Sequence, residues 1–325
     1  MVNSIDERKD KIRFDPHNHY KTSSVLTSYD FRRVVKMSSE RLGDRGIAGL
    51  VNFADKRYEQ FVNSDVCKSR GLELGKEKNA MYFEGEDGDN DAIVVKGQEI
   101  PTRQGHILAM GLGYEKHVRQ YRTFEDTLKE VKDLGAIAIL DHPFYVEGAG
   151  KYVMRNPHLL EQIDAVEIHN GEASFGLLPS KWIESMPLPS GLKKLIPPIK
   201  ANKNARGFYN MFLKQYPHLG AISTSDGHSI SEWFGMVNEF GTSWTEIDEP
   251  ETNANFVESL RNSVRNASHL SRRSKHKSYL GAMNHILDLV WITKIAPKFG
   301  LAKKFDTERP EYYLPPGELP EDKSQ

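Results

Sequence analysis

Histidines and carboxylates recur after separate apolar runs of this sequence, each time in a similar relative position. His17 and His19 follow the first run, in DPHNH, and His142 follows a later one, in DHPF. Asp226 comes after the last of these runs, in SDGH, which also contains His228. Imidazole and carboxylate groups without thiolate are ligands for zinc, manganese or iron. Their joint placement therefore predicts a metal site built from the ends of several strands.

Two further candidate ligands come from the middle of the chain. Glu99 follows KGQ, and His106 opens the run HILAMGL. A glutamate can bridge two ions through its two oxygens, and two ions ~3.5–4 Å apart can share a hydroxide and clamp a phosphoryl oxygen. In a His-x-His on an extended segment, alternate side chains point the same way, so His17 and His19 can reach one ion. This set of residue types favours metal-assisted hydrolysis of a phosphate ester.

The elements that must position these residues alternate between short β-rich runs and helical patterns. Phe124, Leu128, Val131 and Leu134 fall at helical spacing, and Gly135 ends that helix. Such alternation predicts an α/β fold with a parallel sheet, closed as a barrel or left open, and barrels build their sites at the carboxyl ends of strands. The expected strands cover 12–14, 47–53, 92–97, 106–112, 136–140, 165–169 and 221–225, and the expected helices cover 29–43, 56–73, 124–134, 156–163 and 204–216.

The composition narrows the class of protein. The chain has 325 residues, of which 38% are hydrophobic and 27% charged, so a packed core is expected. With a formal net charge of −1 the chain has no overall excess of positive charge, so we expect no stable nucleic-acid partner. The single cysteine, Cys67, excludes an internal disulfide and a multi-cysteine zinc site. Because no apolar leader and no run of ~20 apolar residues occurs, we expect a cytoplasmic protein without a transmembrane segment. The sequence does not specify the oligomeric state.

Composition also suggests a division of the chain. Residues 1–245 are predicted to form the barrel, with an inserted loop at 186–204 that is rich in Pro and Lys. A helical segment is expected over 246–303, followed by a partly disordered tail at 304–325. Apolar residues at helical spacing over 279–298 predict a terminal helix packed on the barrel; the alternative is a helix that docks on a membrane surface or a partner.

The ordered series DPHNH, ADKR, GQE with QGHILAMGL, ILDHPF, DAVEIHNG and TSDGH resembles the motifs of the PHP (polymerase and histidinol phosphatase) superfamily. The resemblance covers roughly residues 11–245. It implies a distorted (β/α)7 TIM-like barrel, here with a C-terminal helical extension, and a site for two or three metal ions. It also implies a small phosphorylated substrate, such as a nucleotide or sugar phosphate, or a short nucleic acid. The stretch EFGTSWTEIDEPETNANFVESLRNSVRNA resembles the corresponding segment of stand-alone members.

The same resemblance distributes the candidate ligands among the ions. Glu99 would bridge the first two ions, and His228 would belong to a third. Asp226 and His228 would also take part in catalysis. The resemblance assigns the first ion to His17, His19 and Asp226, and the second to Glu99, His106 and His142.

The third ion is where this sequence departs from the family pattern. Lys56 replaces the histidine of the usual TDH motif, which reads Ala54-Asp55-Lys56 here. The ligand that usually follows the His-x-His motif by about five residues is also missing, because Ser23, Ser24 and Val25 occupy that stretch. We therefore expect two divalent ions (Mn, Zn or Fe) and a degenerate third site. The Lys56 ammonium could take the place of the lost ion and contact a phosphate oxygen; alternatively, it begins a solvated helix face.

Other residues are candidates for the substrate pocket. Glu167 and His169 end a strand and would support the ligands or line the pocket. The remaining candidates for contacts with phosphate are Arg57, Arg103 and Arg206.

Two competing functions stay open at the level of sequence. An amidohydrolase-type C–N hydrolase also builds on a barrel with a His-x-His motif, but such sites typically use a carbamylated lysine as the bridge, and no lysine stands clearly at the matching strand end. The other alternative is a catalytically weakened PHP fold that serves as a binding or regulatory module. Its main support is Lys56 in place of a histidine ligand.

Overall fold

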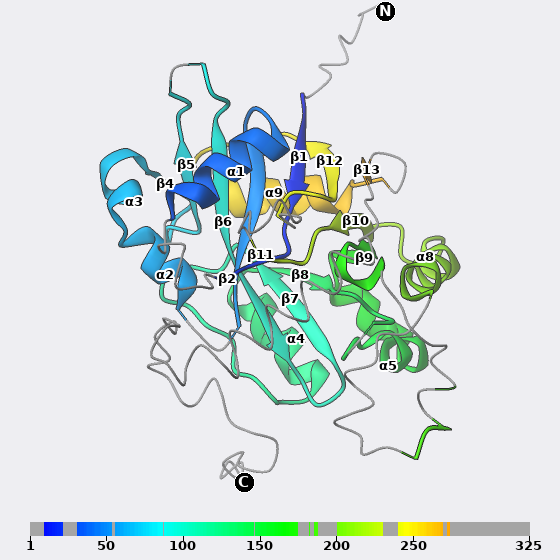
Figure 1. Cartoon of the computed structure of the whole chain (residues 1–325). Helices are drawn as coiled ribbons and strands as arrows, with labels where there is room; N and C mark the ends of the chain where they lie inside the picture. Colours follow the sequence, from blue (N-terminus) through cyan, green and yellow to red (C-terminus); the bar gives the residue numbers. More distant parts are fainter. Residues whose placement is uncertain are drawn as a thin grey trace, which may run out of the picture.

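The computed structural model describes residues 10–21, 31–53, 56–86, 88–145, 147–174, 182, 185–187, 200–229, 240–268 and 272–273. These residues form a mixed α/β fold whose main sheet curls into a nearly closed barrel (Figure 1). The α/β class and the barrel-like sheet expected from the sequence are therefore confirmed. The strands that build the wall are β1 (Lys11–Asp15), β3 (Gly46–Asn52), β6 (Ala92–Pro101), β7 (His106–Met110), β8 (Ile137–Leu140), β9 (Ala165–Asn170), β10 (Gly220–Thr224) and β12 (Trp244–Asp248).

The sheet follows the order β10–β9–β8–β7–β6–β3–β1–β12, with β13 (Arg272–Arg273) beyond β12. Its two sides approach each other where β10 lies beside β12. There the Ser223 N–H donates to Thr245 Oγ1 at 2.7 Å, and the Ala221 N–H donates to the Ala267 carbonyl at 3.0 Å. These bonds satisfy backbone groups that an open sheet edge would leave exposed. On the other side, β4 (Leu72–Leu74) and β5 (Ala80–Phe83) extend the sheet from β6.

The expectation of a wholly parallel sheet is wrong. The pairs β1–β3, β3–β6, β8–β9 and β9–β10 are parallel, whereas β6–β7, β7–β8 and β1–β12 are antiparallel. For the two pairs that involve β7, the reason is a tight connection after β6, in which the Thr102 N–H donates to the Gly105 carbonyl at 2.9 Å. A connection this short can only join antiparallel neighbours, because a parallel pair needs a crossover of a dozen residues or more.

Some element boundaries also differ from the expectation. Strand β6 runs on to Pro101, so Glu99 lies inside a strand instead of after it. The single helix expected over 56–73 is divided into two short helices, and the one expected over 156–163 is a 3-10 helix. The remaining described elements are α1 (Arg32–Leu42), α2 (Arg57–Val62), α3 (Asp65–Arg70), α4 (Phe124–Asp133), α5 (Gly150–Arg155), η1 (Pro157–Gln162), η2 (Glu172–Ser174), α8 (Ala201–Phe212), α9 (Phe256–Arg265), β2 (Asn18–Lys21) and β11 (Gly227–Ser229).

Helices cover the barrel on its outside and at one end. Helices α1 and α2 pack on the outer face of β3 and β6, and α4, α5 and α8 lie on the side of β7 to β10 (Figure 1). The apolar face of α9 joins the interior cluster of the barrel. Gly111, just after β7, lies so close to α9 that a Cβ there would be 2.9 Å from Val257. Because β7 runs away from His106, α9 closes the end opposite the predicted site.

Several predicted segments lie partly outside the described residues. The inserted loop at 186–204 is described only at 186, 187 and 200–204, and the segment 279–298 and the tail at 304–325 are not described. Strand β12 crosses the predicted boundary at residue 245, and α9 falls in the C-terminal segment. The division into domains stays a prediction. Within the described ranges, no helix combines the length and apolar character needed to cross a membrane.

Candidate metal centre

The first two histidines reach the barrel interior because the chain after β1 crosses closely over β3. The crossing point is Gly49, where an added Cβ would lie 1.7 Å from the Pro16 carbonyl oxygen, so only glycine fits without a shift. The Asp15 carboxylate accepts the Ser225 N–H at 2.9 Å, which ties the end of β1 to the end of β10. His17, two residues further along the chain, is thereby brought to the end of β10, and its side chain is fully buried.

One group of possible ligands joins the His-x-His segment to the end of β10. His17 Nε2 lies 3.1 Å from His19 Nε2, and Asp226 Oδ1 lies 3.5 Å from the first nitrogen and 3.8 Å from the second. Ligand atoms around a tetrahedral zinc ion, bonded at ~2.0–2.1 Å, would be about 3.3–3.4 Å apart. The spacing of the three atoms thus fits a shared cation, as the sequence predicts.

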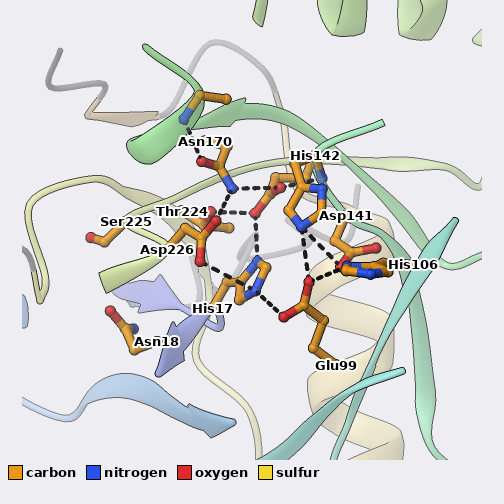
Figure 2. A network of polar contacts seen from close by, with 12 residues as sticks. His17, Asn18, Glu99, His106, Asp141, His142, Asn170, Thr224, Ser225 and Asp226 are labelled. Atoms are coloured by element: carbon orange, nitrogen blue, oxygen red, sulfur yellow. Dashed lines mark hydrogen bonds and ion pairs between the residues drawn. The ribbon is translucent and has the colours of Figure 1, made fainter. Parts of the chain in front are cut away.

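Glu99 stands between this group and a second pair of histidines (Figure 2). Its Oε2 lies 2.9 Å from His19 Nε2. Its Oε1 lies 2.5 Å from His106 Nδ1 and 3.0 Å from His142 Nε2. The two oxygens of one carboxylate therefore face histidines from different strands, which is the arrangement expected of a bridging ligand.

The structure adds Asp141, which the sequence analysis did not single out. Its side chain is fully buried, and neither carboxylate oxygen has a hydrogen-bond partner in the described part of the chain. Asp141, His142, Glu99 and His17 can each offer one ligand atom within 4.8 Å of the others. The signal was present in DHPF, where Asp141 directly precedes a predicted ligand.

Glu167 supports the ligands from behind. Its Oε1 lies 3.1 Å from His17 Nδ1 and accepts the Thr224 hydroxyl, and its Oε2 accepts the His142 backbone N–H. A carboxylate behind the outer nitrogen of a ligating histidine fixes the orientation and tautomer of the ring. This contact agrees with the supporting role predicted for Glu167.

Asn170, a residue that the sequence analysis missed, completes the support. Its Nδ2 donates to Glu167 Oε2 at 3.1 Å and to Asp226 Oδ2 at 2.9 Å (Figure 2). Asp226 is thereby held with its Oδ1 toward His17. His169, in contrast, follows a register shift between β9 and β10, so the spacing of two no longer places it on the face of Glu167. His169 is fully buried, and a role in substrate binding stays a prediction.

The electrostatics of the cluster call for positive charge. Glu99, Asp141, Glu167 and Asp226 are all buried, and when ionised they carry four negative charges, which two divalent cations would balance. Burial lowers the pKa of His106, but the neighbouring carboxylates of Glu99, Glu147 and Asp141 together outweigh burial and raise it to about 10. Without ions, protonated histidines supply the positive charge that balances these carboxylates. Bound metal ions would supply it instead.

Two of the candidate ligands have unusual backbone conformations. His142 has φ +22° and Asp226 has φ +49°, in a region that residues with a side chain rarely adopt. Strain of this kind persists only where the surrounding structure imposes it, and it concentrates at functional sites. Both residues follow the end of a strand, where the turn directs their side chains into the cluster.

The predicted basic residues come from other parts of the fold. Lys56 precedes α2 and is half-buried, and Arg57 is the buried first residue of that helix. Arg103 is exposed in the turn between β6 and β7, where its Nε donates to the Tyr121 carbonyl at 3.3 Å. Arg206 lies half-buried on α8. Contacts of these residues with substrate stay predictions.

Part of the predicted third site lies outside the described residues. This applies to Ser23, Ser24, Val25 and Asp55, and to the side chain of His228, whose backbone belongs to β11. The ligand role of His228 and its role in catalysis therefore stay predictions.

The fold is similar to the crystal structure of the lesion-specific endonuclease PfuEndoQ from Pyrococcus furiosus, with a TM-score of 0.47 and 12% sequence identity. The match covers 96% of this chain and 74% of that chain. At this level of similarity we take neither site residues nor a substrate from that enzyme. No protein-family model and no curated protein matches the sequence, so membership of the PHP superfamily stays a prediction that rests on the motifs.

Proposed function

We propose that this chain is a metal-dependent phosphoesterase that holds two divalent ions inside the barrel. The observation that carries the proposal is Glu99, whose two oxygens face His19 on one side and His106 and His142 on the other. The first ion would be held by His17, His19 and Asp226, whose ligand atoms lie close enough to share an ion. The second would be held by Glu99, His106 and His142, with Asp141 as an added candidate. Two such ions would activate a water molecule and polarise a phosphoryl oxygen.

The chain itself would keep the ligands in place and deprotonated. Glu167 can only accept a hydrogen bond when ionised, so His17 Nδ1 carries the proton and its Nε2 keeps a lone pair for an ion. In the ion-free chain the pKa of Glu167 is lowered despite its burial, because protonated His17 favours the ionised form. An ion bound at Nε2 of neutral His17 would supply that positive charge instead. Asn170 orients Asp226 in the same way, by donating to the oxygen on its far side.

The bridging residue favours phosphate esters over an amidohydrolase reaction. An amidohydrolase-type site would need a carbamylated lysine as its bridge. The lysine of β6 nearest to the site, Lys96, is instead engaged by Glu59 of α2 and is fully buried. Glu99 supplies the bridging carboxylate without any modification.

The first test combines metal analysis with a panel of substrates. We expect about two ions per chain, and turnover of nucleotides, sugar phosphates or short oligonucleotides in the presence of manganese. His17→Ala should lose the first ion and the activity while the barrel stays folded, because the change acts on the site more than on the core. Wild-type turnover and metal content in His17→Ala would refute the proposed site. Two bound ions without turnover on any phosphate or amide substrate would favour the binding-module alternative.

Lys56 allows a second test of the same proposal. If its ammonium replaces the third ion beside the phosphate, Lys56→Ala should lower turnover by roughly 30- to 1000-fold, equivalent to ~2–4 kcal/mol. The metal content should not change. Unaltered kinetics in Lys56→Ala would show that this lysine belongs to the surface of α2.

A further inference from the structure

A second glutamate stands behind His106 as Glu167 stands behind His17. Glu147 lies in the loop after β8, and its Oε2 is 3.1 Å from His106 Nε2. The two residues are also joined through the backbone, because the His106 N–H donates to the Glu147 carbonyl at 3.0 Å. The loop is therefore tied to the first residue of β7 at two points.

These contacts determine which nitrogen of each histidine faces the site. An ionised carboxylate can only accept a hydrogen bond, so the nitrogen beside it must carry the proton. For His17 the protonated nitrogen is Nδ1, beside Glu167, and Nε2 faces His19. For His106 the order is reversed: Nε2 faces Glu147, and Nδ1 lies 2.5 Å from Glu99 Oε1. A bound ion would replace the proton between Nδ1 and Glu99, so that Nε2 keeps its proton beside Glu147.

We infer that Glu147 is a positioning residue, which holds His106 in the tautomer that presents Nδ1 to the second ion. This inference rests on the proposed two-ion site and assigns a function to a residue beyond the candidate ligands. It predicts that the two halves of the site use opposite imidazole nitrogens, Nε2 in His17 and Nδ1 in His106. Since Glu147 contacts His106 of the second half, its loss should affect the second ion and spare the first.

The backbone of Glu147 permits a test that separates positioning from folding. Glu147 has φ +58°, a conformation that glycine adopts without strain. Glu147→Gly therefore removes the carboxylate while relieving the backbone, and its free energy of unfolding should be equal to or higher than that of the wild type. Glu147→Gln keeps an oxygen acceptor and should restore part of the effect. Glu161→Gln, on the exposed side of η1, makes the same charge change away from the site and serves as the control.

The measurement is the stepwise binding of Zn²⁺ to the ion-free full-length chain by calorimetry. We expect Glu147→Gly to weaken the second ion roughly 10- to 100-fold and to leave the first unchanged, with a smaller loss in Glu147→Gln and none in Glu161→Gln. In the Zn²⁺-loaded wild type, ¹⁵N spectra of the histidine rings should show coordination through Nδ1 of His106 and Nε2 of His17.

The outcomes separate this inference from the function on which it rests. A wild-type chain that binds fewer than two ions overturns the two-ion proposal and this inference with it. Two ions in the wild type, with unchanged affinity for both in Glu147→Gly, overturn only the role of Glu147. Equal weakening of both ions, or coordination of His106 through Nε2, has the same consequence.

Discussion

Strand β6 carries a buried polar cluster on each of its faces, and the two clusters are built differently. On the inner face, Glu99 meets histidines from three other segments of the chain. On the outer face, the fully buried Lys96 pairs with Glu59 of α2. Lys96 and Glu99 are three positions apart in the sequence, and the alternation of side chains along a strand places them on opposite sides.

The outer cluster is complete within the chain. The Glu59 carboxylate also accepts from Asn52 Nδ2 at 2.8 Å and lies 3.1 Å from His117 Nε2. The ammonium of Lys96 donates to three backbone carbonyls as well as to Glu59. These carbonyls belong to Gly113 at 3.0 Å, Tyr114 at 2.7 Å and Lys116 at 2.8 Å.

The inner cluster differs in the source of its positive charge. Its ion pairs join carboxylates to histidines, and both oxygens of Asp141 are buried without a hydrogen-bond partner in the described part of the chain. Buried charges are retained when they are paired or when they coordinate metals. The comparison teaches that burial and charge alone do not mark a functional site; a site is indicated where the chain does not supply the balancing cation.

The largest expected effect comes from opening the outer cluster. Lys96→Met removes one of the two cationic partners of the buried Glu59 and a donor to three carbonyls, and should lower the free energy of unfolding by ~3–5 kcal/mol. Urea denaturation measures this change. Lys129→Met is the matched control, since Lys129 is exposed and forms a surface ion pair with Asp133; its change should stay below ~0.5 kcal/mol. Equal effects in the two variants would remove the distinction between a closed cluster and a surface pair.

The next largest expected effect is a loss of stability at acidic pH that depends on the ionisation of Glu59. Burial raises the pKa of Glu59, but His117 and Lys96 outweigh burial and lower it from 4.5 to about 2. Because the pKa of Glu59 is lowered in the folded state, its ionised carboxylate stabilises the fold above pH ~4.5. This contribution, about 3 kcal/mol in total, is lost as the pH falls toward ~2.

Glu59→Gln tests this acid response. The variant lacks the titrating carboxylate, so unfolding free energies of ion-free protein should fall less steeply between pH 4.5 and 2 than in the wild type. At neutral pH it should be less stable than the wild type, because Lys96 loses its counter-charge. Parallel pH profiles of the two proteins would contradict the assignment.

The smallest effect has the opposite sign and concerns the inner cluster. Asp141→Asn makes the same acid-to-amide change as Glu59→Gln, but removes a buried charge that lacks a hydrogen bond. Ion-free Asp141→Asn should therefore be more stable than the wild type by ~1–2 kcal/mol, and its affinity for divalent ions should fall. Thermal unfolding with and without Zn²⁺ measures both. A loss of stability with unchanged metal affinity would place Asp141 among the structural residues.

Much of the fold could be predicted from local patterns. All seven expected strands occur, because each is a short apolar run whose burial depends mainly on its own side chains. The helix over 124–134 was predicted closely, since Thr123 accepts the Asp126 N–H as its cap and Gly135 ends the helix with φ +69°. The direction of β7 was not predicted, because the pattern of an isolated strand contains no information about which neighbour it pairs with.

The sequence by itself determined which residue types are available for metal chemistry and where they lie relative to the strands. His17, His19, Glu99, His142 and Asp226 could be selected in this way because their spacing follows the repeat of strands and helices. Only the tertiary structure decided how these groups pair. The contacts of His17 with Glu167 and of Lys96 with Glu59 join residues that are distant in sequence, 150 and 37 positions apart. Hydrogen-bond partners, tautomers and charge balance depend on distances in space, which local periodicity does not contain.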